Sequence, residues 1–237
     1  METEEKARDR IVVVHGLGAN NGTTWLLSRR LRARGYDVTQ FGYPSLFQSI
    51  EGLAERFEAR LRCLVEQDSQ RPLHLVTHSM GGILTRIVLG KFQPECLGRV
   101  VMLGTPNQGS HAARKVAPYF GRLCYPLVQL SDAPESVIHE VNIPQNVPIG
   151  IIAGTRDRVV ELSATHLPVE SDHYTVPTGH GRLLLRIDVV EQVVHFLQNG
   201  TFSGNSDSTA QQEASETHLA KPRSEEHTSE LQSHSDL

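Results

Sequence analysis

The chain has 237 residues and a formal net charge of -4, and residues 200–237 hold seven of its 27 acidic residues and two of its 23 basic residues. The remaining body is nearly neutral, which excludes the strongly basic surface of a nucleic-acid-binding protein. Because the three cysteines are scattered and no apolar run is long enough to cross a membrane, we expect a soluble, cytoplasmic protein without a disulfide framework.

The composition divides the chain into three parts. Residues 1–10 form a charged segment without the apolar stretch of a secretory signal, and residues 11–199 carry the pattern of one folded α/β domain. Residues 200–237 are rich in Ser, Thr, Gln and Glu, so we expect a disordered tail. Within it, residues 223–237 resemble the translation of a sequencing adapter read in frame, and we expect no function from them.

Short apolar strands alternate with helical stretches through the predicted domain. We predict strands at residues 11–14, 36–41, 73–78, 100–103, 149–153 and 173–176. Helices are predicted from about Trp25 to Arg34 after a cap at Thr23 or Thr24, from a cap at Ser49, from Ser79 to about Lys91, and around residues 187–197. This alternation predicts a mostly parallel sheet of about six strands with helices on both faces.

Residues 111–147 interrupt this alternation. They contain Pro118, Pro126, Pro134 and Pro144, and we expect the prolines to break the segment into short pieces that form a cap insertion rather than a strand. Its apolar residues, with Phe120 and Leu127 among them, either cover an acyl-binding site or simply cover the edge of the sheet. The sequence leaves both alternatives open.

A possible nucleophile lies at the third predicted strand, where Thr77-His78-Ser79-Met80-Gly81-Gly82 places a serine between strand and helix. A serine held at such a turn is exposed to a base and to backbone N–H groups, whereas the alternative is a simple helix cap. Thr77 stands where the pattern G-x-S-x-G has its first glycine. Gly81 should allow close backbone approach, and Gly82 should allow the helix to pack closely.

Two further predicted strands are followed by residues that can act in catalysis. Asp157 follows the fifth predicted strand and His180 follows the sixth, so Ser79, Asp157 and His180 all leave the carboxyl edge of the sheet, where functional loops gather. Asp172 is a rival acid, but it precedes its strand. His166, His173 and His180 are spaced by seven residues without an H-E-x-x-H or Cys-His zinc pattern, so we expect no metal site and no cofactor.

These residues, together with Val14-His15-Gly16-Leu17-Gly18 and Leu103-Gly104-Thr105-Pro106-Asn107-Gln108-Gly109-Ser110, make the chain resemble serine hydrolases of the α/β-hydrolase fold, in particular small bacterial lipases and esterases. The resemblance implies Ser79 as nucleophile, His180 as general base and acid, and Asp157 as its orienting partner. It also implies an oxyanion hole from the backbone N–H groups of Leu17 and Met80.

The reaction expected from this resemblance is hydrolysis of a small-molecule ester or lipid. An acyltransferase with the same three residues and an inactive domain that only binds ligands are the alternatives, and the fold alone does not separate them. His15 is expected to shape the glycine loop and His78 to pack beside the nucleophile. The sequence carries no indication of the oligomeric state.

Overall fold

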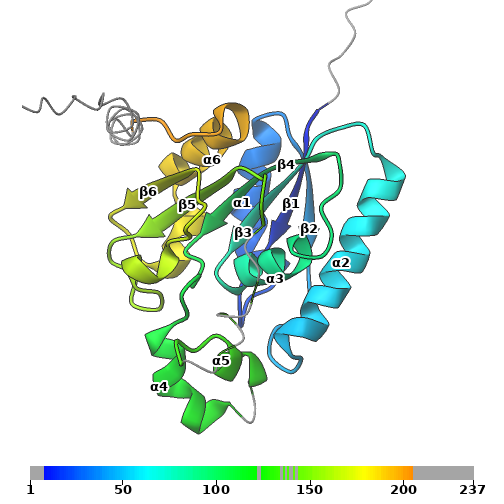
Figure 1. The fold of residues 1–237 in the computed structure, drawn as a ribbon. Helices are drawn as coiled ribbons and strands as arrows, with labels where there is room; N and C mark the ends of the chain where they lie inside the picture. Colours follow the sequence, from blue (N-terminus) through cyan, green and yellow to red (C-terminus); the bar gives the residue numbers. More distant parts are fainter. Residues whose placement is uncertain are drawn as a thin grey trace, which may run out of the picture. The chain divides into compact units, whose positions relative to one another are not determined.

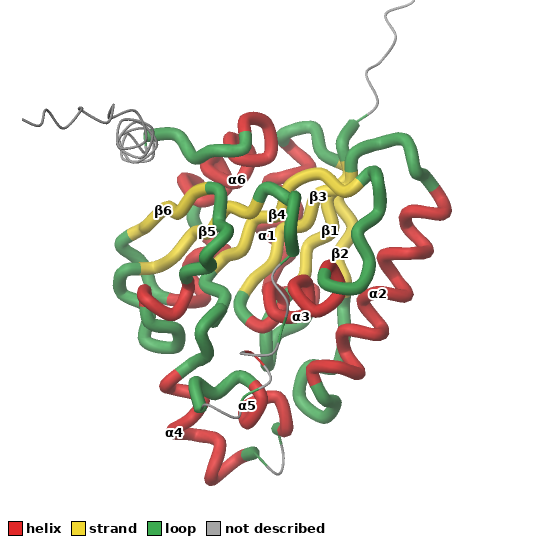
Figure 2. Tube along the Cα trace, in the orientation of Figure 1, coloured by secondary structure: helices red, strands yellow, loops and turns green. Residues whose placement is uncertain are grey.

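A parallel six-stranded sheet forms the centre of the computed structural model, which describes residues 8–121, 124–133, 136, 138, 141 and 144–204, without the side chain of Phe120. The strand order is β2-β1-β3-β4-β5-β6 (Figures 1 and 2). The strands are β1 Arg10–Val14, β2 Asp37–Phe41, β3 Leu73–His78, β4 Leu97–Leu103, β5 Ile149–Gly154 and β6 Asp172–Val176. The predicted parallel sheet is confirmed, and β4 begins three residues earlier than expected.

Helices cover both faces of this sheet, as predicted. They are α1 Asn21–Ala33, α2 Ile50–Gln67, α3 Met80–Leu89, α4 His111–Phe120, α5 Tyr125–Gln129 and α6 Ile187–Asn199, with short 3-10 helices η2 Leu162–Thr165 and η3 His180–Leu185. Helices α2 and α3 lie on one face and α1 and α6 on the other (Figure 1). No helix within the described ranges is both long and apolar enough to cross a bilayer.

The two apolar cores follow the alternation of side chains along the strands. In β1, Val12 and Val14 belong to the core under α2 and α3, whereas Ile11 and Val13 belong to the core under α1 and α6. Both faces of β1 are therefore buried, which explains why its sequence is a continuous apolar run rather than an alternating one. This burial holds the carboxyl edge of the sheet in place, where the candidate site lies.

The start of α1 differs from the prediction. The helix begins at Asn21, because the side chain of Asn20 accepts a hydrogen bond from the backbone N–H of Gly22 and caps the helix. Thr23 and Thr24 lie inside the first turn, where their hydroxyls donate to the carbonyls of Asn20 and Asn21. The predicted caps at Thr23 and Thr24 are therefore wrong, whereas Ser49 caps α2 as predicted.

The cap insertion contributes α4 and α5, which lie beyond one edge of the sheet (Figure 1). Pro118 was expected to break the segment, but it lies inside α4, so this prediction is wrong. The proline lacks an N–H donor, yet it does not end the helix. Pro126 stands in the first turn of α5, a position that proline favours. The predicted role of Pro134 falls outside the described residues, and so does the side chain of Phe120.

Helix α5 is fastened to α2 through one side chain. The amide oxygen of Gln129 accepts from the backbone N–H of Ile50 at 2.7 Å, and its amide nitrogen donates to the carboxylate of Glu51. These bonds satisfy a backbone donor at the start of α2, where intrahelical partners are missing. They place the insertion over the carboxyl edge of the sheet.

The folded unit continues past the predicted boundary at residue 199 and reaches Ser203. Gly200 ends α6 with a φ of 83°, and the chain then turns so that Phe202 is buried beside Phe196 and Tyr174. The backbone N–H of Phe202 donates to Asp172 at 2.7 Å. Beyond Gly204, the expected disordered tail lies outside the described residues.

Candidate active site

Ser79 occupies a strained turn between β3 and α3. Its φ is 53° and its ψ is -125°, a backbone conformation that non-glycine residues rarely adopt. A Cβ on Gly81 would lie 2.7 Å from the carbonyl oxygens of Val14 and His15, and one on Gly82 would overlap the side chain of Thr105. Both glycines are therefore required by close packing, as predicted, and the turn presents Ser79 beside the end of β1.

His180 and Asp157 meet across neighbouring strand exits. The Nδ1 of His180 lies 2.6 Å from Oδ2 of Asp157, and the other carboxylate oxygen accepts from the backbone N–H groups of Val159 and Val160. Because Asp157 accepts from Nδ1–H, the Nε2 of His180 keeps its lone pair and is available as a base. The structure thus brings two of the predicted site residues into direct contact.

The environment keeps Asp157 ionised. Burial alone would raise the pKa of its carboxyl, but the hydrogen bond and charge of His180, together with the two backbone donors, outweigh burial and lower the pKa overall. Its side chain is only 2 % exposed. A buried, charged carboxylate beside an imidazole stabilises the protonated form of that imidazole.

Asp172, the rival acid, has a different position. It begins β6 at the amino end of the strand, and its two carboxylate oxygens accept from the backbone N–H groups of His173 and Phe202. This places it away from the carboxyl edge, where Asp157 contacts His180. Asp172 fastens the end of the domain to β6, which supports the choice of Asp157.

The loop after β1 lies against the nucleophile. A Cβ on Gly16 would lie 2.8 Å from the Cβ of Ser79, so the backbone that leads to Leu17 passes directly beside the serine. The N–H groups of Leu17 and Met80 have no hydrogen-bond partner in the described part of the chain. Two free donors beside a serine are the arrangement that an oxyanion hole requires.

Tyr43 holds this loop, and the sequence analysis did not identify it. Its ring stacks on His15 with centroids 4.1 Å apart, and its hydroxyl donates to the carbonyl of His15 at 2.5 Å. The N–H of Gly18 is fixed in turn by the hydroxyl of Ser45. His15 therefore shapes the glycine loop, as expected, but its partners come from the segment after β2, which no local motif indicates.

His78 packs beside the candidate pair. Its ring lies 4.7 Å from that of His180, and its Nε2–H donates to the carbonyl of His180 at 3.3 Å. Burial, followed by the nearby charge of His180, lowers the pKa of His78 to about 3. His78 is thus neutral at pH 7 and supports the backbone of His180 rather than moving protons.

An apolar pocket of about 390 Å³ opens at Ser79 and His180. Its walls come from the glycine loop, from the loops after β4 and β5, and from the insertion: Leu17, Pro106, Ser110, Ala112, Ala113, Val116, Leu127, Leu130, Val159 and Val160. Leu127 of α5 therefore lines the same pocket as Ser79. In the described residues no hydrogen bond joins Ser79 to His180, so the two side chains must approach each other before a proton can pass.

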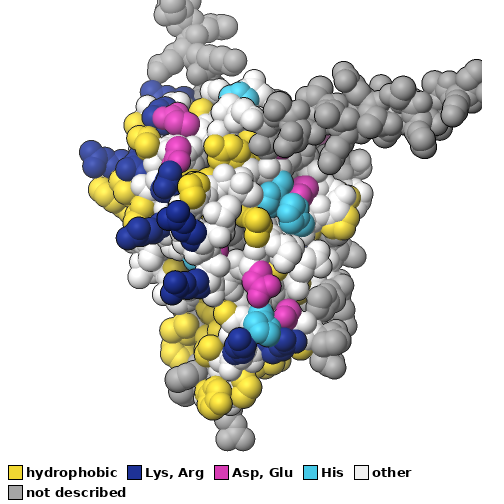
Figure 3. Space-filling model, turned by 90° about the vertical axis from the view of Figure 1, so that its left-hand side faces the viewer, with side chains coloured by type: hydrophobic (Ala, Val, Ile, Leu, Met, Phe, Trp, Pro, Cys, Tyr) yellow, Lys and Arg dark blue, Asp and Glu magenta, His cyan; other side chains and the backbone are white. Residues whose placement is uncertain are grey.

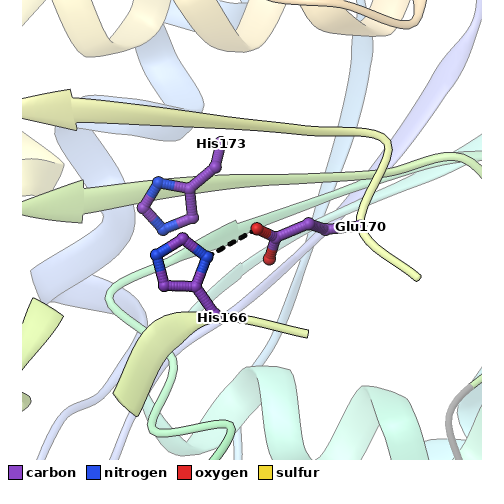
Figure 4. Close-up of side chains that lie close together, drawn as sticks. All are labelled: His166, Glu170 and His173. Carbon is purple, nitrogen blue, oxygen red and sulfur yellow. Dashed lines mark hydrogen bonds and ion pairs between the residues drawn. The ribbon is translucent and has the colours of Figure 1, made fainter. Parts of the chain in front are cut away.

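A second pair of histidines consists of His166 in the loop after η2 and His173 in β6. His166 and His173 stack with centroids 3.9 Å apart, and Nδ1 of His166 lies 2.7 Å from the carboxylate of Glu170 (Figure 4). Burial, followed by the charge of His166, lowers the pKa of His173 to about 4. Of the three equally spaced histidines, only His180 joins the candidate active site.

The surface on the β6 side of the molecule shows two chemical regions. Lys and Arg side chains gather in one part, while histidine and acidic side chains lie together in another (Figure 3). A cavity of about 1000 Å³ has four arginines in its lining: Arg156, Arg158, Arg182 and Arg186.

A family model and solved structures are similar to this chain. The model of the α/β hydrolase family matches residues 11–123, which include Ser79 but neither Asp157 nor His180. No curated protein matches the sequence.

Solved structures share the fold at low identity. The mature lipase BlEst2 of Bacillus licheniformis is 20% identical with a TM-score of 0.60 over 85% of this chain and 96% of that chain. A lipase-esterase related protein of Clostridium acetobutylicum is 16% identical with a TM-score of 0.57 over 82% and 95%. The phospholipase PlaB of Legionella pneumophila is 17% identical with a TM-score of 0.58 over 66% of this chain and 43% of that chain. The chain therefore has the α/β-hydrolase fold and resembles the lipases and esterases that share it.

Proposed function

We propose that the chain is a serine hydrolase that cleaves carboxylic esters through an acyl intermediate on Ser79. The observation that carries the proposal is that Ser79 and His180 open into one apolar pocket while His180 is bonded to the buried carboxylate of Asp157. The names of the structural neighbours, which include a lipase, a phospholipase and a lipase-esterase related protein, support this class of substrate.

In the acylation step, the Oγ of Ser79 attacks the ester carbonyl while Nε2 of His180 takes the hydroxyl proton. Asp157 stabilises the imidazolium that forms, and the N–H groups of Leu17 and Met80 donate to the negatively charged oxygen of the tetrahedral intermediate. His180 then gives its proton to the leaving alcohol as the carbon–oxygen bond breaks, and the acyl group stays on Ser79.

Deacylation repeats these steps with water. His180 removes a proton from water, the hydroxide attacks the acyl carbonyl, and Ser79 leaves with the proton returned by His180. The products are a carboxylic acid and a regenerated serine. If an alcohol took the place of water, the same residues would transfer the acyl group, which is the acyltransferase alternative.

The pocket favours esters with an apolar acyl chain. Its lining is apolar on the side of the insertion, where Val116, Leu127 and Leu130 face the same space as Ser79. Each methylene removed from water contributes about 0.8 kcal/mol, so medium-chain esters should react faster than acetate esters. Of the two roles that the sequence left open for the insertion, this lining supports the acyl-site cover.

The decisive experiment uses a fluorophosphonate probe and p-nitrophenyl esters on the wild type and on Ser79→Ala. We expect labelling and hydrolysis by the wild type, and a loss of both by several orders of magnitude in the variant because no nucleophile remains. An unchanged melting temperature is the control for folding. Activity retained by purified Ser79→Ala protein would overturn the proposal, and absence of labelling in folded wild type would favour the inactive binding domain.

A further inference from the structure

The side chains of His166, Glu170 and His173 form a cluster of metal-ligating groups outside the candidate active site. Each offers one ligand atom, and these three atoms all lie within 4.8 Å of one another (Figure 4). His166 and Glu170 belong to the loop after η2, and His173 belongs to β6. The seven-residue spacing noted in the sequence thus pairs His166 with His173, while Glu170, which no motif indicated, supplies the third group.

The cluster is held by hydrogen bonds around it. The second carboxylate oxygen of Glu170 accepts from the backbone N–H of Leu167 at 2.7 Å, which leaves the first oxygen toward His166. The carbonyl of His166 accepts from the side chain of Gln108, and the carbonyl of Thr165 accepts from Asn107. Such outer contacts orient the groups that would bind an ion.

We propose that these three residues bind a divalent transition-metal ion of the zinc class, with water in the remaining position. Two imidazoles and one carboxylate are a donor set that suits zinc, whereas calcium and magnesium prefer oxygen alone. The two rings are stacked with centroids 3.9 Å apart, and Nε2 of His173 lies 3.0 Å from the hydroxyl of Thr165, so one imidazole turns on binding. His166 is free to do so because half of its side chain is exposed.

Metal binding at this position acts on the loop that carries Asp157. The connection between β5 and β6 begins with Asp157, whose carboxylate is held by Val159 and Val160, and it ends at His173. An ion bound by His166, Glu170 and His173 joins the loop to β6 and limits the motion of the connection where it enters β6. The ion is therefore expected to stabilise the domain, and it takes no part in the ester chemistry.

The test measures zinc binding by the full chain after treatment with a chelator and exhaustive dialysis. Zinc chloride is titrated in competition with a chromophoric chelator, for the wild type, His166→Ala, Glu170→Gln and the control His195→Ala. His195 is a half-buried histidine of α6 that contacts the carbonyl of Thr201 and no acidic side chain in the described residues. The readouts are the number of tightly bound equivalents and the zinc-dependent rise in melting temperature.

We expect one tight equivalent in the wild type and in His195→Ala, and roughly tenfold or greater weakening in each ligand variant. The absorption spectrum of the cobalt-loaded protein should lack thiolate bands, which separates this cluster from the three cysteines. No tight equivalent in the wild type, equal affinity in the ligand variants, or thiolate bands would each overturn the proposal. Ester hydrolysis is not needed for any of these readouts, so the result is independent of the proposed function.

Discussion

Asp157 and Asp172 flank neighbouring strands at opposite ends. Asp157 follows β5 at the carboxyl edge, where His180 also emerges, and Asp172 begins β6 at the amino edge. The sequence already distinguished them, because the position of an acid relative to its strand decides at which edge of a parallel sheet it lies. The second role of Asp172, to accept from Phe202, was not predictable because it depends on a turn after α6.

Replacing these two residues should separate catalysis from stability. Asp157→Asn should lower kcat by roughly 10³- to 10⁴-fold with little change in KM, because an amide cannot stabilise the imidazolium of His180. Asp172→Asn should keep most of the activity and lower the melting temperature, because one acceptor of two backbone N–H groups is weakened. Steady-state kinetics and thermal melts of both variants check this, and the opposite pattern would assign the acid to Asp172.

At the scale of elements, the sequence predicted those features that depend on neighbouring residues in one segment. The strand exits and the cap at Ser49 follow from patterns within one segment of the chain. The predicted start of α1 was wrong because Asn20, Thr23 and Thr24 can all cap a helix. Which of them does so depends on backbone angles, which cannot be read from the residue types. Tyr43 was missed because its contact with His15 joins segments 28 residues apart.

The insertion offers a matched pair of substitutions on one short helix. Leu127 lines the pocket, whereas its neighbour Val128 is 45% exposed and does not. Leu127→Ser should reduce hydrolysis of octanoate esters several-fold more than that of acetate esters, because only the longer chain reaches this wall and loses apolar contact. Val128→Ser should leave the ratio unchanged. A p-nitrophenyl ester series checks this, and equal losses at every chain length would show that the insertion is only scaffold.

At the scale of the whole molecule, the neutral histidines His78 and His173 make the fold sensitive to acid. Burial lowers the pKa of His78 to about 3 and that of His173 to about 4, so the unfolded chain binds more protons than the folded one between these values and about 6.5. Stability therefore falls as the pH drops through this window. The pKa of Asp157 is lowered in the folded chain, so its carboxylate also stabilises the fold. This contribution to stability is lost only when the pH falls below the ordinary pKa range of an aspartate.

We expect the free energy of unfolding of chelator-treated protein to decrease steadily from pH 6.5 to pH 4.5, with each of these two histidines contributing up to about 1.4 kcal/mol per pH unit. Chemical denaturation at several pH values measures this. His173→Gln should flatten the slope, because one proton acceptor of the unfolded chain is removed. A stability that stays constant over this range would contradict the argument.

The docking of Phe202 decides where the chain can be shortened. Its ring is buried against Phe196 and Tyr174, so a protease that removes the tail should stop just beyond Gly204 and leave a fragment that melts like the full chain. A chain that ends at Gly200 should melt roughly 5 °C lower or more, because it exposes the apolar surface that Phe202 covers. Mass spectrometry of the digest and melting curves of the two truncated chains test this. The docking of Phe202 thus places the end of the folded unit inside a stretch whose composition is that of a disordered tail.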